Sequence, residues 1–411
     1  MSLVRELYIK LIKNLTINKI KYIFLIFLFS PFLILIVLIK PIFFVRFGNL
    51  SIQRIGNISS AERYLLDNIH KKKKVRSFDI WVIDNYICNQ QSLVLLKRKF
   101  LIIKELCIFY NVLKLISKYI SICSKHIIVL TSAHMVAIDK DSCQLNLTRK
   151  EIGKGEAILK NFGIPANAKI VCISGRDNLY LKKRYTSKDF SYHDYRDINV
   201  KNYIPAIKAL IKKNYYVVRM GKFSNKKINI KSHKFIDYPF HPLKNDFMDF
   251  FFAHKCYFWI CSNTGLDEIA KVFRKPLLDL NMAPVAGLKV TSKKTLLCSK
   301  IHKNYSNKKL SLNEIFDAGV GNTAHSKEFK RKKIRLNELT SGQIKDAVLE
   351  MTKLMKNSWK IKNKNDLKLQ KKFKKLYLNR IKKIDPKCSY KKINALYSLV
   401  FLKKNPWFLK Q

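Results

Sequence analysis

The chain has 411 residues, which is room for two domains of ordinary size. Hydrophobic residues make up 48% of it, so the composition excludes a wholly disordered protein. Lys and Arg number 81 against 28 Asp and Glu, a formal net charge of +53 that first indicates nucleic-acid binding. The lysines are spread from end to end, however, and no zinc-finger, RNA-binding or helix-turn-helix pattern is present. We therefore expect no specific nucleic acid as partner, but nucleotide phosphates or an anionic membrane surface.

An almost wholly apolar run, YIFLIFLFSPFLILIVLI, fills 22–39 and is just long enough to span a bilayer. Ser30 and Pro31 would kink it, and basic residues on both sides leave its orientation open. It fits a single-span anchor, a re-entrant monotopic helix or a buried core helix. We favour a membrane-associating segment over 1–44, with the body at the cytoplasmic face of the inner (cytoplasmic) membrane.

From Phe47 the pattern becomes α/β. A strand is predicted over 78–84, helical spacing over 92–122 and another strand over 126–131. Together these elements indicate a Rossmann-like domain over 45–164.

The pattern is clearer over 165–340, where strands alternate with helices. Strands are predicted at 169–174, 215–221 and 234–238, a helix within 195–215 with Pro205 near its start, and another helix at 247–255. This alternation predicts a parallel, doubly wound sheet, the second Rossmann-like domain of the chain.

The most informative stretch, FWICSNTGLDEIAKVFRKPLLDLNMAP, runs from Phe258 to Pro284 and is typical of a strand–turn–helix–strand unit. The turn Ser262–Gly265 contains N-cap residues and a glycine, and two carboxylates follow in the first helical turn. Ligands of open α/β sheets bind at the carboxyl ends of strands, where a helix N-terminus can receive an anion. The alternative is an ordinary capped helix without a ligand.

Two arginines of this half also stand at predicted strand ends. Arg176 follows the strand 169–174, and Arg219 closes the strand 215–221. In a parallel sheet both reach the same edge as the turn Ser262–Gly265, a set suited to a diphosphate. Such cations can stabilise a leaving diphosphate without a metal. Arg176 could instead form a structural ion pair with Asp177.

The remaining range, 341–411, predicts a helix at 344–357, a very basic helical segment at 360–393 and an apolar end at 395–409 that can dock on the body. The basic segment is either a solvated helix face or a surface for anionic lipid.

The ordered set VCISGRDNLY, YRDINVKNYIPAIKALIKKNYYVVRMG, FIDYPF and the long stretch ending at Pro284 resembles a family of bacterial glycosyltransferases of surface-polysaccharide loci. The resemblance covers roughly 165–290. The family looks like GT-B enzymes and is related to fucosyltransferase-like and heptosyltransferase-like groups. One departure is that the fucosyltransferase-like pattern has a His before its Arg, whereas Ser174 and Gly175 precede Arg176 here.

The resemblance implies a donor site for a nucleotide-sugar. It makes Arg176 the catalytic and donor-phosphate residue. Other donor contacts are expected from the turn and from the second strand-end arginine: Arg219, Ser262, Asn263, Thr264, Gly265 and Glu268.

Other features carry less weight. Asp139, Lys140 and Asp141 form a DxD, the metal–nucleotide signature of GT-A enzymes. Possible catalytic bases are His134, His193, His241 and Asp84, among which the sequence does not choose. The nine cysteines show no CxxC pair and no zinc spacing, so we expect a reduced protein without a metal site.

The sequence thus predicts an α/β protein with two Rossmann-like domains in the GT-B architecture and an N-terminal hydrophobic membrane-associating helix. Its expected activity is metal-independent transfer of a sugar from a nucleotide-sugar, used as substrate with no cofactor, to a glycan or lipid-linked acceptor. Two alternatives stay open: another polysaccharide-modifying transferase such as a pyruvyl transferase, and a non-catalytic basic protein that binds membrane or nucleic acid.

Overall fold

The computed structural model describes residues 17–70, 77–130, 141–262, 264–386 and 393–410. Several predicted residues lie outside these ranges, namely His134, Asp139, Lys140 and Asn263. Contacts divide the chain into two units. Unit 1 comprises Met1–Arg54 with Asp67–Thr131, and unit 2 comprises Ile55–Leu66 with Ser132–Gln411.

Unit 1 contains a parallel four-stranded sheet in the order β3-β2-β1-β4. The strands are β1 (Phe44–Asn49), β2 (Ser77–Val82), β3 (Leu101–Ile102) and β4 (Ile127–Ile128). Its helices are α2 (Ile17–Leu38), α4 (Gln90–Lys97), α5 (Cys107–Ile116), α6 (Ser121–Ser124) and the end of α3 (Ile58–His70). The strands predicted at 78–84 and 126–131 are confirmed. The continuous helical spacing predicted over 92–122 is wrong, because β3 interrupts it where Leu101 and Ile102 pair with β2.

The apolar run near the N-terminus forms helix α2, with Pro31 inside it. Within the described residues, no helix combines the length and the hydropathy needed to cross a bilayer. Leu33 and Ile36 are buried in a core with Phe109 and other α5 side chains, and the Phe29 ring meets the Phe109 ring edge-on at 5.5 Å. The structure therefore does not support a membrane span at α2. One face of this helix packs into the core of unit 1 instead.

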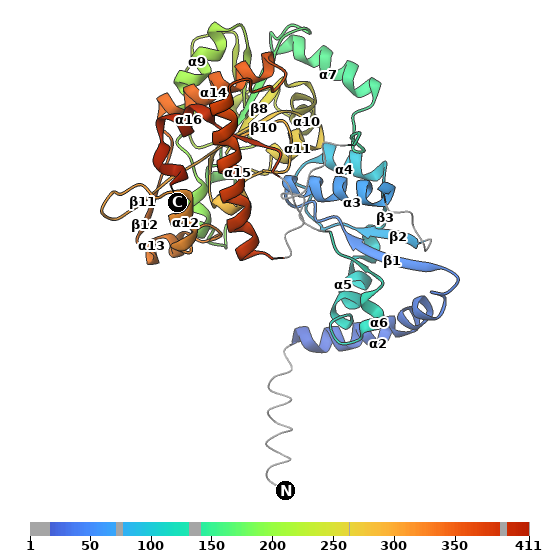
Figure 1. Ribbon diagram of the computed structural model, residues 1–411. Helices are drawn as coiled ribbons and strands as arrows, with labels where there is room; N and C mark the ends of the chain where they lie inside the picture. The colour runs from blue at the N-terminus through green and yellow to red at the C-terminus, as the bar shows by residue number, and fades with distance from the viewer. Residues whose placement is uncertain (1–16, 71–76, 131–140, 263, 387–392, 411) are drawn as a thin grey trace. The chain divides into compact units, whose positions relative to one another are not determined.

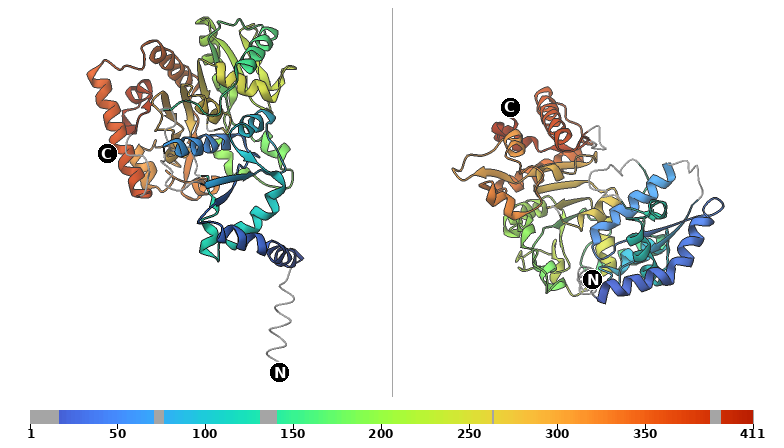
Figure 2. Two further views of the ribbon diagram at one scale, coloured as in Figure 1. Left: turned by 90° about the vertical axis from the view of Figure 1, so that its right-hand side faces the viewer. Right: turned by 90° about the horizontal axis from the view of Figure 1, so that it is seen from below.

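Unit 2 is built on a parallel seven-stranded sheet in the order β13-β10-β9-β8-β5-β6-β7 (Figures 1 and 2). The strands are β5 (Ile170–Ser174), β6 (Tyr216–Met220), β7 (Phe235–Asp237), β8 (Phe258–Cys261), β9 (Leu277–Met282), β10 (Thr295–Ser299) and β13 (Leu396–Tyr397). An antiparallel pair, β11 (Ile301–Asn304) and β12 (Ile334–Asn337), stands apart. The parallel sheet predicted for this half is confirmed. Its central strands are buried on both faces, which explains their continuous apolar runs.

Helices cover both faces of this sheet (Figure 1). On one face lie α9 (Ile204–Lys212) and α14 (Ser341–Lys356), and on the other α7 (Arg149–Asn161), α10 (Asp246–Lys255) and α11 (Asp267–Val272). Shorter helices are α8 (Leu179–Arg184), α12 (Leu312–Asp317) and α13 (Ser326–Arg331). The helix predicted within 195–215, with Pro205 near its start, is confirmed as α9, and two 3-10 turns, η3 (Ser191–Arg196) and η4 (Val200–Tyr203), precede it.

The range 341–411 adds core to unit 2. Helix α15 (Lys364–Ile384) buries Phe373, Tyr377 and Ile381 through its 3.6-residue period, although most of its surface is basic. Helix α16 (Leu399–Lys404) and η7 (Pro406–Leu409) follow β13, and their aromatic side chains join the same core. The predicted docking of 395–409 on the body is confirmed.

Candidate functional site at the switch point of the unit 2 sheet

Strand β5 is the point where the strand order of unit 2 reverses. The chain passes from β5 to β6 and β7 on one side, then returns to place β8 on the other side of β5. Open α/β sheets bind ligands at such a point, outside the carboxyl ends of the two central strands. Here those ends continue into two turns, Gly175–Asp177 after β5 and Ser262–Leu266 after β8.

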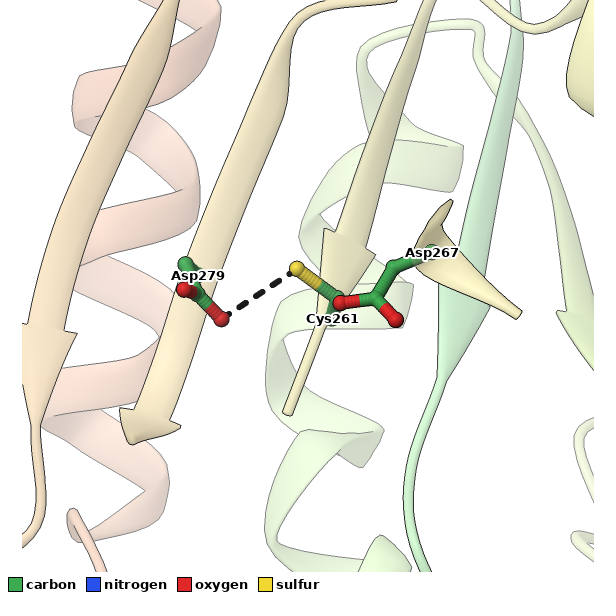
Figure 3. A group of neighbouring side chains, drawn as sticks. All are labelled: Cys261, Asp267 and Asp279. Atoms are coloured by element: carbon green, nitrogen blue, oxygen red, sulfur yellow. Dashed lines mark hydrogen bonds between the residues drawn. The ribbon is translucent and has the colours of Figure 1, made fainter. Parts of the chain in front are cut away.

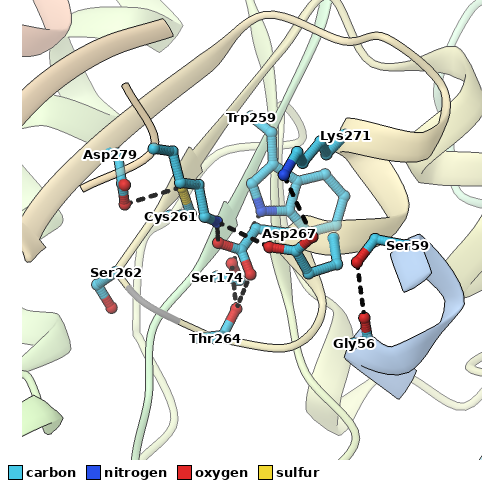
Figure 4. Close-up of polar contacts among 12 residues, drawn as sticks. Gly56, Ser59, Ser174, Trp259, Cys261, Ser262, Thr264, Asp267, Lys271 and Asp279 are labelled. Carbon is cyan, nitrogen blue, oxygen red and sulfur yellow. Dashed lines mark hydrogen bonds and ion pairs between the residues drawn. The ribbon is translucent and has the colours of Figure 1, made fainter. Parts of the chain in front are cut away.

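Hydrogen bonds tie the two turns together. The Arg176 backbone N–H donates to Ser262 Oγ at 3.3 Å, and the hydroxyls of Ser174 and Thr264 lie 3.1 Å apart. Trp259 Nε1 donates to Ser174 Oγ at 2.8 Å from within the sheet (Figure 4). Thr264 is half-buried and Gly265 is exposed, while Ser262 is buried. Thr264 and Gly265 are therefore the accessible residues here, and Ser262 holds the two strands' ends in register.

A third segment borders this turn. The loop η1 (Ile55–Asn57), which precedes α3, belongs to unit 2 and packs on the start of α11. A Cβ on Gly265 would lie 3.2 Å from the Gly56 backbone N, and a Cβ on Gly56 would lie 3.1 Å from Gly265 Cα. The close approach of the two backbones thus favours glycine at both positions. The sequence indicated Gly265 only as a residue that allows a turn.

The Arg176 side chain forms an ion pair with Asp197, in the segment between η3 and η4. The same nitrogen, Nη1, donates to the His193 carbonyl at 2.8 Å. The side chain is only 9% exposed, and its Nη2 is buried without a hydrogen-bond partner among the described residues. The ion pair considered from the sequence, with Asp177, does not form. Asp177 instead accepts hydrogen bonds from neighbouring loops, including one from Ser224 Oγ at 2.9 Å.

Two further cations surround Asp197, and sequence analysis missed both. Lys300 Nζ donates to the Asp197 carbonyl at 2.7 Å, and burial lowers the pKa of Lys300. Burial, together with Arg176, also lowers the pKa of Arg196. Neither stands at a predicted strand end: Lys300 follows β10, about a hundred residues along the chain, and Arg196 is the last residue of η3, in a stretch of mixed polar residues. Only the fold brings these charges together.

Arg219 has a different environment. Its Nε lies 2.7 Å from the Asp237 carboxylate on the neighbouring strand, and its Nη1 donates to the Lys226 carbonyl at 2.8 Å. Both partners of this ion pair are nearly fully buried. The geometry favours a structural bridge between β6 and β7, and the donor contact expected of Arg219 stays a prediction.

The start of α11 differs from the predicted open helix N-terminus. The helix has six residues, its N-cap is Leu266, and no side chain caps it. Thr264 Oγ1 donates to the Asp267 carboxylate at 3.2 Å instead of accepting from a backbone N–H of the helix. Asp267 and Glu268 are buried and contact Lys289, which forms an ion pair with Asp267 and lies 3.5 Å from Glu268. The first turn is therefore occupied by its own carboxylates, and the expected donor contact of Glu268 stays a prediction.

Lys289 neutralises this buried group of carboxylates. Burial lowers the pKa of Lys289, but Asp267 and the neighbouring acidic groups outweigh this effect and raise that pKa well above its ordinary value. Lys271 lies 3.9 Å from Glu268 as a second counter-charge. A continuous chain of contacts thus runs from Lys289 through Asp267 to the hydroxyl of Thr264.

One set of side chains here could in principle hold a metal ion. The ligand atoms of Cys261, Asp267 and Asp279 all lie within 4.8 Å of one another (Figure 3). Cys261 Sγ donates to Asp279 at 3.3 Å, and burial raises the pKa of Asp279 to about 7. The Lys289 ammonium is already bound to Asp267. A divalent cation would have to displace that ammonium and deprotonate the thiol, whose pKa burial raises.

Of the candidate bases that the structure describes, His193 lies beside Arg176, and His241 and Asp84 contact other residues. The His241 ring stacks on Phe162 at 4.4 Å, and burial lowers its pKa. His193 contributes its carbonyl to Arg176. Asp84 lies in unit 1 at the end of β2 and accepts from Asn49 Nδ2 at 3.4 Å. No catalytic base is identified among these described residues.

Comparisons with known proteins give two structures of glycosyltransferases. The chain is similar to E. coli ADP-heptose LPS heptosyltransferase II, with 10% identity, a TM-score of 0.35 and coverage of 58% of this chain and 86% of that one. It is also similar to a glycosyl transferase family 9 protein from Veillonella parvula, with 9% identity, a TM-score of 0.44 and coverage of 75% and 97%. No family model and no curated protein matches the chain. At these TM-scores, neither likeness carries weight for the fold or the function.

The charges around Lys289 predict a strong stability effect. Replacing Lys289 by Met leaves Asp267 and Glu268 buried without their counter-charge, which should lower the free energy of unfolding by about 3–5 kcal/mol. Urea unfolding followed by circular dichroism measures the change. The matched control is Lys308→Met, which removes an exposed pair with Glu314 and should cost less than about 1 kcal/mol. A Lys289→Met variant as stable as this control contradicts the assignment.

Proposed function

We propose that this chain is a glycosyltransferase of the GT-B type that transfers a sugar from a nucleotide-sugar to a glycan or lipid-linked acceptor in surface-polysaccharide synthesis. The observation that carries the proposal is the placement of Arg176. Its buried guanidinium stands at the switch point of a parallel α/β sheet with one nitrogen unpartnered, beside the exposed glycine turn that ends at Gly265. The family resemblance of 165–290 supports the same reading.

The chemistry follows from these positions. The donor diphosphate would lie between Arg176 and the backbone of the turn at Thr264 and Gly265. The acceptor hydroxyl attacks the anomeric carbon, the bond from that carbon to the diphosphate oxygen breaks, and the hydroxyl proton passes to a base. Negative charge then grows on the leaving oxygen, where the field of Arg176 and its neighbours Arg196 and Lys300 stabilises it. We assign acceptor binding to the N-terminal half, 45–164.

Arg176 provides the direct test of this assignment. Arg176→Ala should lower transfer activity by about a hundredfold or more, because it removes a charge that acts on the leaving group. A thermal-shift screen of UDP-, GDP-, ADP- and CMP-linked sugars first identifies the donor, and initial rates then compare the two proteins.

The control variant is Arg331→Ala, which removes an exposed arginine paired with Glu328 and should keep full activity. A fully active Arg176→Ala variant with native circular dichroism removes the basis of the proposal. A shift with activated donors other than nucleotide-sugars would favour another transferase, such as a pyruvyl transferase.

We also propose that the reaction needs no metal and no cofactor. The support is the Lys289 ammonium, which already supplies the positive charge at the acidic group below the turn. Transfer rates measured with excess EDTA should therefore equal those without it, within about twofold. Loss of activity in EDTA that manganese restores would favour a metal site, for example at the DxD of 139–141.

We place the protein at the cytoplasmic face of the inner membrane, with α2 lying in the plane of the membrane surface. One face of α2 is covered by α5, but the other exposes large apolar side chains, among them Phe27 at 79% and Phe32 at 58%. Exposed lysines on α5 and beside α6, the elements packed against α2, complement anionic headgroups; they are Lys114, Lys118 and Lys125. An interfacial helix combines such an apolar face with flanking cations.

Sedimentation with lipid vesicles tests this placement. The protein should bind vesicles that contain phosphatidylglycerol and bind phosphatidylcholine vesicles less, and Phe27→Ser with Phe32→Ser should abolish sedimentation. Tyr305→Ser, which alters an exposed aromatic residue of unit 2, is the control. If the double variant still sediments, or if a dimer rather than a vesicle covers α2, the placement is wrong.

A further inference from the structure

We propose that Asp197 takes, in the donor-free protein, the place beside Arg176 that a donor phosphate oxygen takes in the complex, and that it thereby sets the affinity for the donor. The inference rests on the proposed function, since it concerns the same site. It adds a residue that neither the sequence pattern nor the comparisons point to.

The contact itself has the required chemistry. A guanidinium binds carboxylate and phosphate oxygens through the same planar array of N–H donors. Arg176 uses Nη1 for Asp197 and for the His193 carbonyl, and Nη2 has no partner among the described residues. An entering phosphate would therefore gain one free donor and compete with Asp197 for the other.

The two partners of this ion pair differ in their access to solvent. The Arg176 side chain is 9% exposed, whereas that of Asp197 is 26% exposed. The carboxylate can rotate outward into water, while the guanidinium stays where the sheet places it. This asymmetry is what an exchange of anions at a fixed cation requires.

Hydrogen bonds that do not involve the Asp197 carboxylate hold the backbone around this residue. The Ile198 N–H donates to the Arg176 carbonyl at 3.1 Å, and Lys300 Nζ binds the Asp197 carbonyl. Two residues before Asp197, the Tyr195 N–H donates to Ser326 Oγ at 3.2 Å. Release of Arg176 thus needs a rotation of one side chain and no opening of the segment.

Burial makes the Asp197 carboxylate easier to displace. Burial raises the pKa of Asp197 to about 6, against the opposing effect of Arg176. The groups whose charges act on Asp197 are the cations Arg176, Arg196 and Lys300 and the carboxyls of Asp177 and Asp194, and the His193 carbonyl shares Arg176 Nη1 with it. A diphosphate diester stays ionised at every pH where Asp197 titrates, so protonation of Asp197 favours the diphosphate.

The experiment is isothermal titration with UDP-glucose, ADP-glucose and GDP-mannose as probes. Asp197→Asn should bind the probe that the wild type binds with a Kd lower by about three- to tenfold, because the competing charge is gone. Asp197→Ser gives a second uncharged side chain if the Asn variant does not fold. The matched control is Asp189→Asn, which removes an exposed carboxylate of the same segment that bonds only to Ser191, and it should leave the Kd unchanged.

Two further readouts separate exchange from a structural role. The ratio of the wild-type Kd to the Asp197→Asn Kd should fall toward one as the pH is lowered from about 7.5 to 5.5, since the wild-type carboxyl then becomes neutral. In an Arg176→Ala background, Asp197→Asn should give no gain.

Weaker or unchanged binding by Asp197→Asn, with a wild type that binds a probe, overturns this inference alone and leaves the proposed function standing. Absence of binding to all three probes by the wild type and by both uncharged variants overturns the inference and the proposed function together.

Discussion

The ion pair between Lys289 and Asp267 is the interaction on which the shape of the candidate site depends. Its lysine is the counter-charge for carboxylates that have no access to water. Through Asp267 it fixes the Thr264 hydroxyl, which in turn meets Ser174 at the end of the neighbouring strand. Removing two carboxylates from water is costly, and only a cation in direct contact offsets that cost. The ion pair beneath the turn after β8 therefore holds that turn in place, and its exposed side needs no side-chain cap.

That arrangement explains why the exposed part of the turn can be so bare. Gly265 and Gly175 carry no side chain, and the η1 backbone at Gly56 approaches to within contact distance of a would-be Cβ. A bulky residue would force these backbones apart. Close packing thus accounts for glycine at these positions, and the rigidity of the turn after β8 is supplied by the ion pair of Lys289 with Asp267. Open α/β sheets place ligands at this position.

The sequence predicted the strands of unit 2 well, because strands buried on both faces read as continuous apolar runs such as 169–174. It also predicted that Arg176 and the turn Ser262–Gly265 share an edge, since parallel strands align their carboxyl ends. The sequence did not predict the ion-pair and hydrogen-bond partners of these residues. Asp197 and Lys300 come from distant loops without periodic pattern, and Asp177, adjacent in sequence, was the nearer but wrong choice for the ion pair. The prediction of a capped start for helix α11 was wrong for a related reason. The sequence alone does not show that Lys289 is the partner of Asp267.

The two ion pairs of the site obey the same electrostatics but differ in exposure, and in the proposed function this difference separates the structural cation Lys289 from the donor-binding cation Arg176. Lys289 and Asp267 are both sealed from solvent, so neither can exchange its partner without leaving a bare charge inside the protein. Arg176 is equally confined, but its partner Asp197 borders water and can be hydrated when displaced. A buried cation with a removable anion is a binding site for another anion of similar geometry. A buried cation with a fixed anion is part of the fold.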